Sequence, residues 1–278
     1  MNVHTDHTRW WIPQPGPDES LRSVLGRAAA LYECTPDELW ASLNQDDCGS
    51  SGEIDSSSCT ALLRVAKALG TRAVGLLPHR FADVPWHLTP RARRCFCPSC
   101  WNEELRLGRP RTLKRAWNHV LRTRCPIHGL PLNLAPETWA TTTTRYEHPV
   151  PTFTPEEQGT LDLIESLGVA LEQSLYFGTP WPEGWRGTPQ AARSLVASLC
   201  VNMNSERDFP PIRNVMATSA LSAVISTPRH TQEPFRGHAW EAFRGIANPG
   251  IRRAALWVAA WRLVPELPST LSPGWNWP

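Results

Sequence analysis

Residues 97–128 begin with Cys97-Pro98-Ser99-Cys100 and end, after 24 intervening residues, with Cys125-Pro126-Ile127-His128. Two residues between paired ligands let both side chains of a turn face one ion, and a few dozen residues between two such turns suffice to complete a tetrahedron. Three thiolates and one imidazole form a closed shell, which is typical of a structural ion. We therefore predict one structural Zn²⁺ held by Cys97, Cys100, Cys125 and His128, rather than four ordinary buried residues, and expect it to supply most of the local folding free energy.

The remaining cysteines lack a partner at ligand spacing. Cys95 precedes Cys97 by two residues, a poor geometry for a ligand turn, so we leave it outside the metal site. His119 is expected on a helix over residues 112–122, as a packing or solvent-facing side chain. Core or loop thiols are expected at Cys34, Cys48, Cys59 and Cys200.

The net charge of +2 is unevenly distributed along the chain. Residues 91–124 carry ten basic and two acidic residues, a balance of +8, whereas the rest of the chain carries 18 basic and 24 acidic residues. Such a basic segment is the usual electrostatic signature of a phosphate-backbone partner, although we expect some members to pair with acids elsewhere in the chain. The candidate DNA contacts are Arg91, Arg93, Arg94, Arg109, Arg111, Lys114, Arg115, Arg122 and Arg124.

Apolar spacing and start signals predict a mostly α-helical chain. Leu21, Val24, Leu25, Ala28 and Leu31 form one face of a helix over residues 18–33. A threonine followed by proline, the start of a capped helix, occurs at residues 35, 154 and 188. No segment shows the alternation of a strand. Further helices are expected over residues 58–69, 155–175, 189–203, 211–226, 238–247 and 249–264.

These signals divide the chain into four parts. We predict a helical, helix-turn-helix-like N-terminal block over residues 1–85, a Cys3His zinc-finger insert over 86–135, a linker over 136–154 and a helical C-terminal domain over 155–278. A second helix-turn-helix would best fit residues 189–226, although its turn is longer than usual. No apolar stretch approaches the roughly 20 residues of a transmembrane helix, and residues 1–11 lack the core of a secretory signal. We therefore expect a soluble cytoplasmic protein.

Two stretches of the sequence carry a resemblance. Residues 13–28 read PQPGPDESLRSVLGRA, and residues 96–104 read FCPSCWNEE, followed by Arg115-Ala116-Trp117 and by RCPIHGLPL at 124–132. They resemble the TniQ/TnsD family of transposon target-selection proteins, with its "E-S-L-x-S-W-x-x-R" helix and its "C-P-x-C … W … C-P-x-H" zinc element. Val24 stands where the family usually has tryptophan, a substitution we expect in the core. The resemblance covers residues 10–135, and its zinc ligands correspond to the four predicted here.

The resemblance implies a non-catalytic accessory role in DNA transposition. Family members bind target DNA, or a guide-RNA complex on it, and pass the site to an AAA+ ATPase of TniB/TnsC type, which recruits the transposase. A bacterial protein at the nucleoid, without membrane contact, is expected on the same basis. The sequence leaves three points open: the target sequence, whether DNA is read directly or through a guide complex, and whether the protein forms a homodimer.

Two other classes of function compete with this interpretation. A scaffold without nucleic-acid contact would use Trp257, Trp261, Arg252, Arg253 and Arg262 as a docking face, unless both tryptophans simply pack their helix. A zinc-dependent nuclease or deaminase is disfavoured. A deaminase combines a His-x-Glu or Cys-x-Glu stretch with a Pro-Cys-x-x-Cys turn, and the upstream residues 85–89 lack the glutamate. A nuclease would need a free histidine or an acidic pair near an open metal, and the sequence offers no convincing one.

Overall fold

A computed structural model describes residues 12–44, 53–81, 84–140, 146–201, 220–225 and 238–265. Two compact units are present. Unit 1 comprises Met1–Pro85, Glu103–Ala116 and Pro136–Glu147, and unit 2 comprises Trp86–Asn102, Trp117–Ala135 and His148–Pro278. The residues of the expected zinc-finger insert, 86–135, are divided between both units. The four-part division along the sequence stays a prediction.

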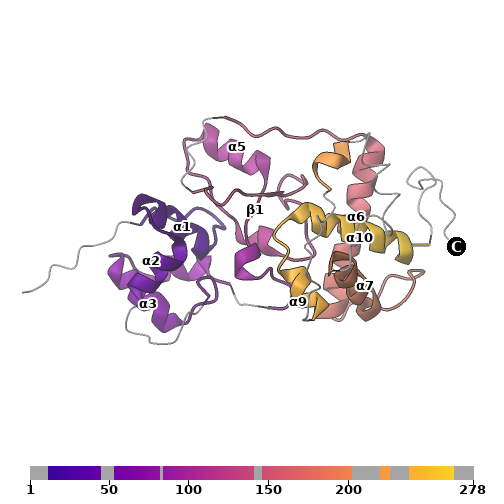
Figure 1. Cartoon of the computed structure of the whole chain (residues 1–278), viewed down its shortest axis with the longest axis horizontal. Helices are drawn as coiled ribbons and strands as arrows, with labels where there is room; N and C mark the ends of the chain where they lie inside the picture. The colour runs from indigo at the N-terminus through magenta and orange to yellow at the C-terminus, as the bar shows by residue number, and fades with distance from the viewer. Residues whose placement is uncertain are drawn as a thin grey trace, which may run out of the picture. The chain divides into compact units, whose positions relative to one another are not determined.

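Unit 1 is built on helices α1 (Leu21–Leu31), α2 (Pro36–Leu43), α3 (Cys59–Ala68) and α4 (Ala73–Leu76), of which α1, α2 and α3 lie together in Figure 1. The predicted capping box at α2 is confirmed, because Thr35 and Glu38 exchange side-chain and backbone hydrogen bonds. A 3-10 turn, Leu77–His79, follows α4. The four-residue turn 32–35 joins α1 and α2, and helix-turn-helix character stays a prediction.

The apolar face predicted for α1 is confirmed over its first turns, where Leu21, Val24, Leu25 and Ala28 are fully buried. Leu31 is an exception, because 56% of its surface is exposed at the end of the helix. From the predicted linker, Trp139 is buried and approaches Gly26 so closely that a Cβ there would lie 3.2 Å from its ring. The small residue in α1 therefore makes room for this tryptophan.

Unit 2 contains α6 (Pro155–Tyr176), α7 (Pro189–Val201), α9 (Ala239–Arg244) and α10 (Pro249–Leu263). Helix α10 packs against both α6 and α7, and α7 packs against α9. Thr154 and Glu157 form the capping box of α6, and the Asn248 side chain caps α10 by accepting from the Gly250 N–H. The predicted helix over 211–226 lies outside the described residues, apart from 220–225 with the 3-10 turn Ala220–Ala223.

Short elements surround the predicted metal ligands. Strand β1 (Cys95–Phe96) pairs antiparallel with β2 (Asn133–Leu134), and helix α5 (Pro98–Arg106) begins directly after Cys97. Strands of two residues are too short to show an alternation in the sequence, and they leave the prediction of a mostly α-helical chain unchanged. A 3-10 turn, Pro90–Ala92, precedes β1.

The predicted helix over residues 112–122 is wrong. Only a 3-10 turn, Arg115–Asn118, forms there. Backbone groups of this stretch bond to distant segments instead of to the preceding turn: the Asn118 carbonyl accepts from the Leu88 N–H, and the Val120 N–H donates to the Trp86 carbonyl. The mostly α-helical class is nevertheless confirmed, and within the described ranges no helix is long and apolar enough to cross a bilayer.

Candidate metal centre and basic segment

The four predicted ligands converge in unit 2. Their ligand atoms all lie within 4.8 Å of one another. The His128 Nδ1 lies 3.6 Å from Cys97 Sγ, 3.3 Å from Cys100 Sγ and 3.8 Å from Cys125 Sγ. The sulfurs of Cys100 and Cys125 are 3.8 Å apart, and all three cysteines are buried. Sequence spacing therefore predicts this cluster correctly.

These distances fit a tetrahedral zinc ion. Zn–S bonds of about 2.3 Å and a Zn–N bond of about 2.0 Å place tetrahedral sulfurs about 3.8 Å apart and sulfur about 3.5 Å from nitrogen. A Zn²⁺ in this cluster would complete its coordination with protein atoms alone, which suits a structural role. Burial beside other thiols, above all the contact with Cys125, raises the pKa of Cys100, so a metal entering the cluster would release protons.

Local backbone bonds shape both ligand turns. The Trp101 N–H donates to the Cys97 carbonyl at the start of α5. In the second turn, the Gly129 N–H donates to the Cys125 carbonyl, and Gly129 has a φ of +63°, which a glycine adopts without strain. Behind the first turn, the rings of Phe96 and Trp101 stack with centroids 3.8 Å apart. A backbone hydrogen bond thus holds each turn, and aromatic stacking supports the first.

Two arginines of α10 hold the backbone that leads into the second turn. Arg253 donates to the carbonyls of Thr123, Leu132 and Val224 at 2.7–2.9 Å. Arg252 donates to the carbonyls of His119 and Val120. Both side chains are almost completely buried. Burial, with the adjacent charge of Arg252, lowers the pKa of Arg253.

The predicted docking face on α10 is therefore wrong for Arg252 and Arg253. Carbonyl groups of a non-helical segment need donors, and these arginines turn inward to supply them. Trp257 is buried as well, in agreement with the packing alternative. Cys95 lies apart from the ligand cluster, with its sulfur 3.2 Å from Arg252 Nη2 and 3.6 Å from the Ala247 carbonyl.

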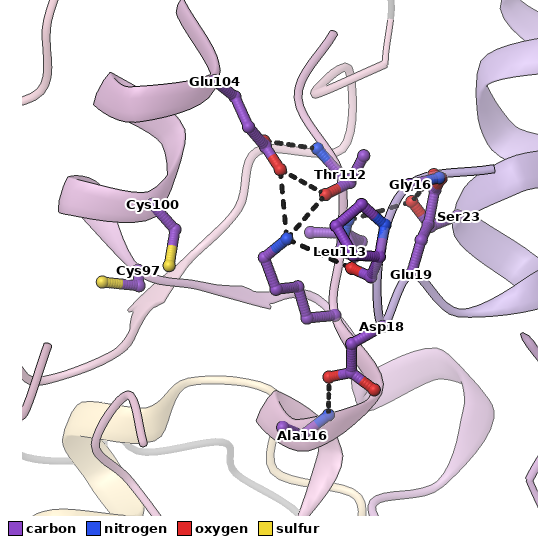
Figure 2. A network of polar contacts seen from close by, with 12 residues as sticks. Gly16, Asp18, Glu19, Ser23, Cys97, Cys100, Glu104, Thr112, Leu113 and Ala116 are labelled. Atoms are coloured by element: carbon purple, nitrogen blue, oxygen red, sulfur yellow. Dashed lines mark hydrogen bonds and ion pairs between the residues drawn. The ribbon is translucent and has the colours of Figure 1, made fainter. Parts of the chain in front are cut away.

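A second polar cluster lies in unit 1, around the E-S-L-x-S sequence. Glu19 is fully buried and forms an ion pair with Arg27. Its carboxylate also accepts from the Ser23 hydroxyl and the Gly16 N–H. The Ser23 hydroxyl oxygen accepts from the Leu113 N–H, which joins α1 to residues 112–114 (Figure 2). Val24 is in the core, as predicted.

Comparison with protein families agrees with both motifs. The TniQ family model matches residues 10–132, a little under half of the chain, and this range includes the Glu19 cluster and all four candidate metal ligands. Residues 10–132 match a TniQ domain. This domain is that of a transposition-associated accessory protein. Curated proteins and solved structures gave no match.

All nine predicted DNA contacts lie within the TniQ domain, and five of them belong to unit 2. Arg91 is exposed and Arg94 is half-buried. Arg93 is buried and donates to the Leu88 carbonyl. Arg122 pairs with Glu172 at 2.7 Å, and Arg124 pairs with Asp162. Two of these cations therefore already have carboxylate partners within α6.

The other four predicted contacts belong to unit 1. Arg109 is exposed, and Arg111 is half-buried, where burial lowers its pKa. Lys114 Nζ lies 3.2 Å from the Glu104 carboxylate, which also accepts from Thr112, as Figure 2 shows. Arg115 pairs with Asp18 at 3.1 Å. Arg91 and Arg109 are thus the two members of the predicted set that are exposed.

A buried cluster that the sequence does not reveal surrounds Glu172 of α6. Its carboxylate lies 3.3 Å from His119 Nε2 and accepts from Arg122. Burial lowers the pKa of His119. Burial alone would raise the pKa of Glu172, but its contacts with His119 and Arg122 lower it overall. His119 is therefore a packing residue of unit 2, in agreement with the prediction that it is not a metal ligand.

Proposed function

We propose that this protein is a non-catalytic accessory protein that binds DNA at a transposition target, alone or with a guide-RNA complex, and recruits an AAA+ ATPase of TniB/TnsC type. The single observation that carries this proposal is the TniQ domain with its Cys3His cluster. The closed ligand shell supports a structural use of the metal, because every position around a zinc ion would be filled by protein atoms.

The basic segment supports DNA binding at two exposed positions. Arg91 lies on the 3-10 turn Pro90–Ala92, and Arg109 lies just beyond α5. Exposed guanidinium groups bind phosphate oxygens through two parallel hydrogen bonds. Four of the other candidates, Lys114, Arg115, Arg122 and Arg124, have carboxylate partners, and a phosphate would have to compete with these.

The test is duplex DNA binding by the zinc-loaded chain at several salt concentrations. We expect affinity to fall steeply as salt rises, and the log–log slope to decrease by about 0.9 for each phosphate contact removed. Arg91→Ala and Arg109→Ala should each weaken binding, whereas the exposed Arg186→Ala, outside the TniQ domain, should not. Absence of duplex binding at low salt, or binding indifferent to salt, would rule out direct DNA contact by the free protein.

A scaffold without direct DNA contact is the second candidate, favoured by the ion pairs that engage those four cations. It predicts that the protein binds the ATPase in the absence of DNA, and that Arg91→Ala and Arg109→Ala leave this binding unchanged. Co-purification of the two proteins after nuclease treatment separates the two functions.

A further inference from the structure

Four exposed cations of the TniQ domain have no ion-pair partner within the described part of the chain: Lys67, Arg72, Arg91 and Arg109. Arg91 and Arg109 lie in the basic segment, whereas Lys67 lies in the last turn of α3 and Arg72 at the start of α4. An exposed cation without a carboxylate partner can bind a phosphate oxygen without first giving up an ion pair. Lys67 and Arg72 are therefore candidate contacts that the charge balance of residues 91–124 does not include.

The turn between α3 and α4 brings these two cations to one place. The Gly70 N–H donates to the Lys67 carbonyl, and the Thr71 N–H donates to the Ala66 carbonyl. Gly70 has a φ of +63°, so the chain turns at the end of α3 without strain. Arg72 follows this turn directly as the N-cap residue of α4. Both cations therefore lie at the same end of α3.

The charge around this turn is positive over a long stretch of sequence. Residues 56–82 contain four basic residues and no acidic one. The two described acids that precede α3 have partners of their own. Glu53 accepts from the backbone N–H groups of Asp55 and Ser56, and Asp55 accepts from the Arg22 N–H. This stretch therefore attracts a polyanion, and the acids next to it in sequence are already engaged.

Helix α2 does not share this charge. A helix-turn-helix reads DNA with its second helix, which would be α2 here, because the four-residue turn 32–35 precedes it. Residues 32–44 contain three acidic residues and no basic one, and Asp37 and Glu38 are exposed on α2. These carboxylates would repel phosphate groups. Charge therefore favours α3 over α2 as the helix that faces nucleic acid.

The exposed side of α3 suits the major groove of DNA. Thr60, Leu63 and Lys67 are exposed and recur at helical spacing, so they lie on one face, whereas Leu62 and Val65 on the other side are buried in the core of unit 1. A threonine hydroxyl can bond to base edges, and an apolar side chain can contact the thymine methyl group. Helix α3 thus combines base-facing groups with cations at its end.

We propose that the α3 face, defined as Thr60, Leu63 and Lys67, forms a second duplex-DNA contact together with Arg72. Helix α3 enters the major groove, Leu63 contacts base edges, and the two cations bind phosphate oxygens beside the groove. This inference rests on the proposed DNA binding, and it adds a surface in unit 1 outside the basic segment. An acidic segment of a partner protein would meet the same cations, so the experiment includes that outcome.

The test compares two double variants of the zinc-loaded full chain that lose the same charge. The α3 double variant, Lys67→Ala with Arg72→Ala, removes the proposed phosphate contacts. The control, Arg186→Ala with Arg262→Ala, removes two exposed cations outside the TniQ domain. Fluorescence anisotropy of a labelled mixed-sequence duplex of about 40 base pairs is measured between about 50 and 200 mM salt. We expect the log–log slope to decrease by about 1.8 in the α3 double variant, for two phosphate contacts, and to match wild type in the control.

Leu63→Ala tests whether α3 itself lies on the DNA. It should weaken binding several-fold at every salt concentration without changing the slope, because it removes an apolar contact and no charge. Leu31→Ala, at a similarly exposed apolar position of α1, should bind as wild type does. Lys67→Gln with Arg72→Gln repeats the charge test with longer side chains, should the alanine substitutions lower the melting temperature.

The outcomes separate this inference from the proposed function. An unchanged slope in the α3 double variant, while Arg91→Ala and Arg109→Ala still weaken binding, would overturn the inference and leave the proposed DNA binding intact. Equal slopes in both double variants would also overturn it, because total charge alone would then explain the loss. Absence of duplex binding by wild type would overturn both proposals. If the α3 double variant keeps its DNA affinity but no longer co-purifies with the ATPase after nuclease treatment, the α3 face binds protein and the inference is wrong.

Discussion

Arg27 and Glu19 form an ion pair at 2.7 Å in which the arginine side chain is 7% exposed and the carboxylate 0%. The same carboxylate accepts hydrogen bonds from the Gly16 N–H and the Ser23 hydroxyl, and the Ser23 hydroxyl oxygen accepts one from the Leu113 N–H. This pair therefore joins the start of α1 to a segment some 90 residues away in sequence. It explains why the E-S-L-x-S sequence includes an acid at a position without solvent access.

Glu19→Gln should destabilise the protein strongly, because it leaves the Arg27 guanidinium buried without a counter-charge. Breaking a buried pair from one side costs about 3–5 kcal/mol, and urea unfolding measures this loss. Asp37→Asn is the matched control, since Asp37 pairs with Arg22 but is 68% exposed, and it should change the unfolding free energy little. Equal effects of the two substitutions would contradict a structural role for the Glu19 pair.

Zinc removal should unfold the ligand turns. We expect one zinc ion per chain by elemental analysis, and loss of protease resistance over residues 90–130 after chelation or in Cys100→Ser, because the metal supplies much of the local folding free energy. Cys59→Ser removes an exposed thiol away from the cluster and should retain both zinc and resistance. Undiminished resistance in zinc-free protein would show that packing alone holds this segment.

Spacing predicts the four ligands because a metal turn is local: two residues fix which side chains face each other. Helix starts at Thr35 and Thr154 are likewise local, since a cap depends on three or four neighbouring residues. The contacts of Arg252 and Arg253 are not local. Nothing within α10 reveals that the backbone carbonyls of residues 119–132 require donors. Long-range contacts also decide the non-helical path of residues 112–122, so the periodicity of the sequence could not predict it.

Arg253→Met should lower the unfolding free energy by about 3 kcal/mol or more, because three carbonyl acceptors lose their donors inside the protein. It should also speed zinc loss to a chelator, measured with a colorimetric zinc indicator. Arg253→Lys should not restore stability, since one ammonium group lacks the planar fork that reaches three acceptors. Arg262→Met, at an exposed position of the same helix, is the control that should behave as wild type.

Gly168→Ala should destabilise the protein, although alanine ordinarily favours a helix by about 1 kcal/mol over glycine. A Cβ at Gly168 would overlap the Leu121 carbonyl oxygen, so α6 would have to move away from the segment that precedes the second ligand turn. Gly75→Ala in α4 meets open space and should be neutral or stabilising. Thermal unfolding of both variants checks this, and a raised melting temperature for Gly168→Ala would contradict the close contact.

Acid should destabilise the His119–Glu172 cluster. The pKa of His119 is lowered in the folded protein, so the unfolded chain binds more protons as pH falls below about 6.5, and stability declines. The lowered pKa of Glu172 adds a further loss below about 4.5. Zinc release also contributes in acid, so the measurement is the difference between wild type and His119→Gln in urea unfolding from pH 7 to pH 5. Identical pH slopes for the two proteins would exclude His119 as a contributor.

The buried guanidinium groups of α10 have a consequence for what can be exchanged between related proteins. The family match ends at residue 132, yet four carbonyl oxygens before or at that point take their donors from Arg252 and Arg253. A chimaera that joins this TniQ domain to a foreign C-terminal half would inherit four acceptors and lose their donors. The smallest transplantable piece of this protein is therefore larger than its recognisable domain, and it includes α10.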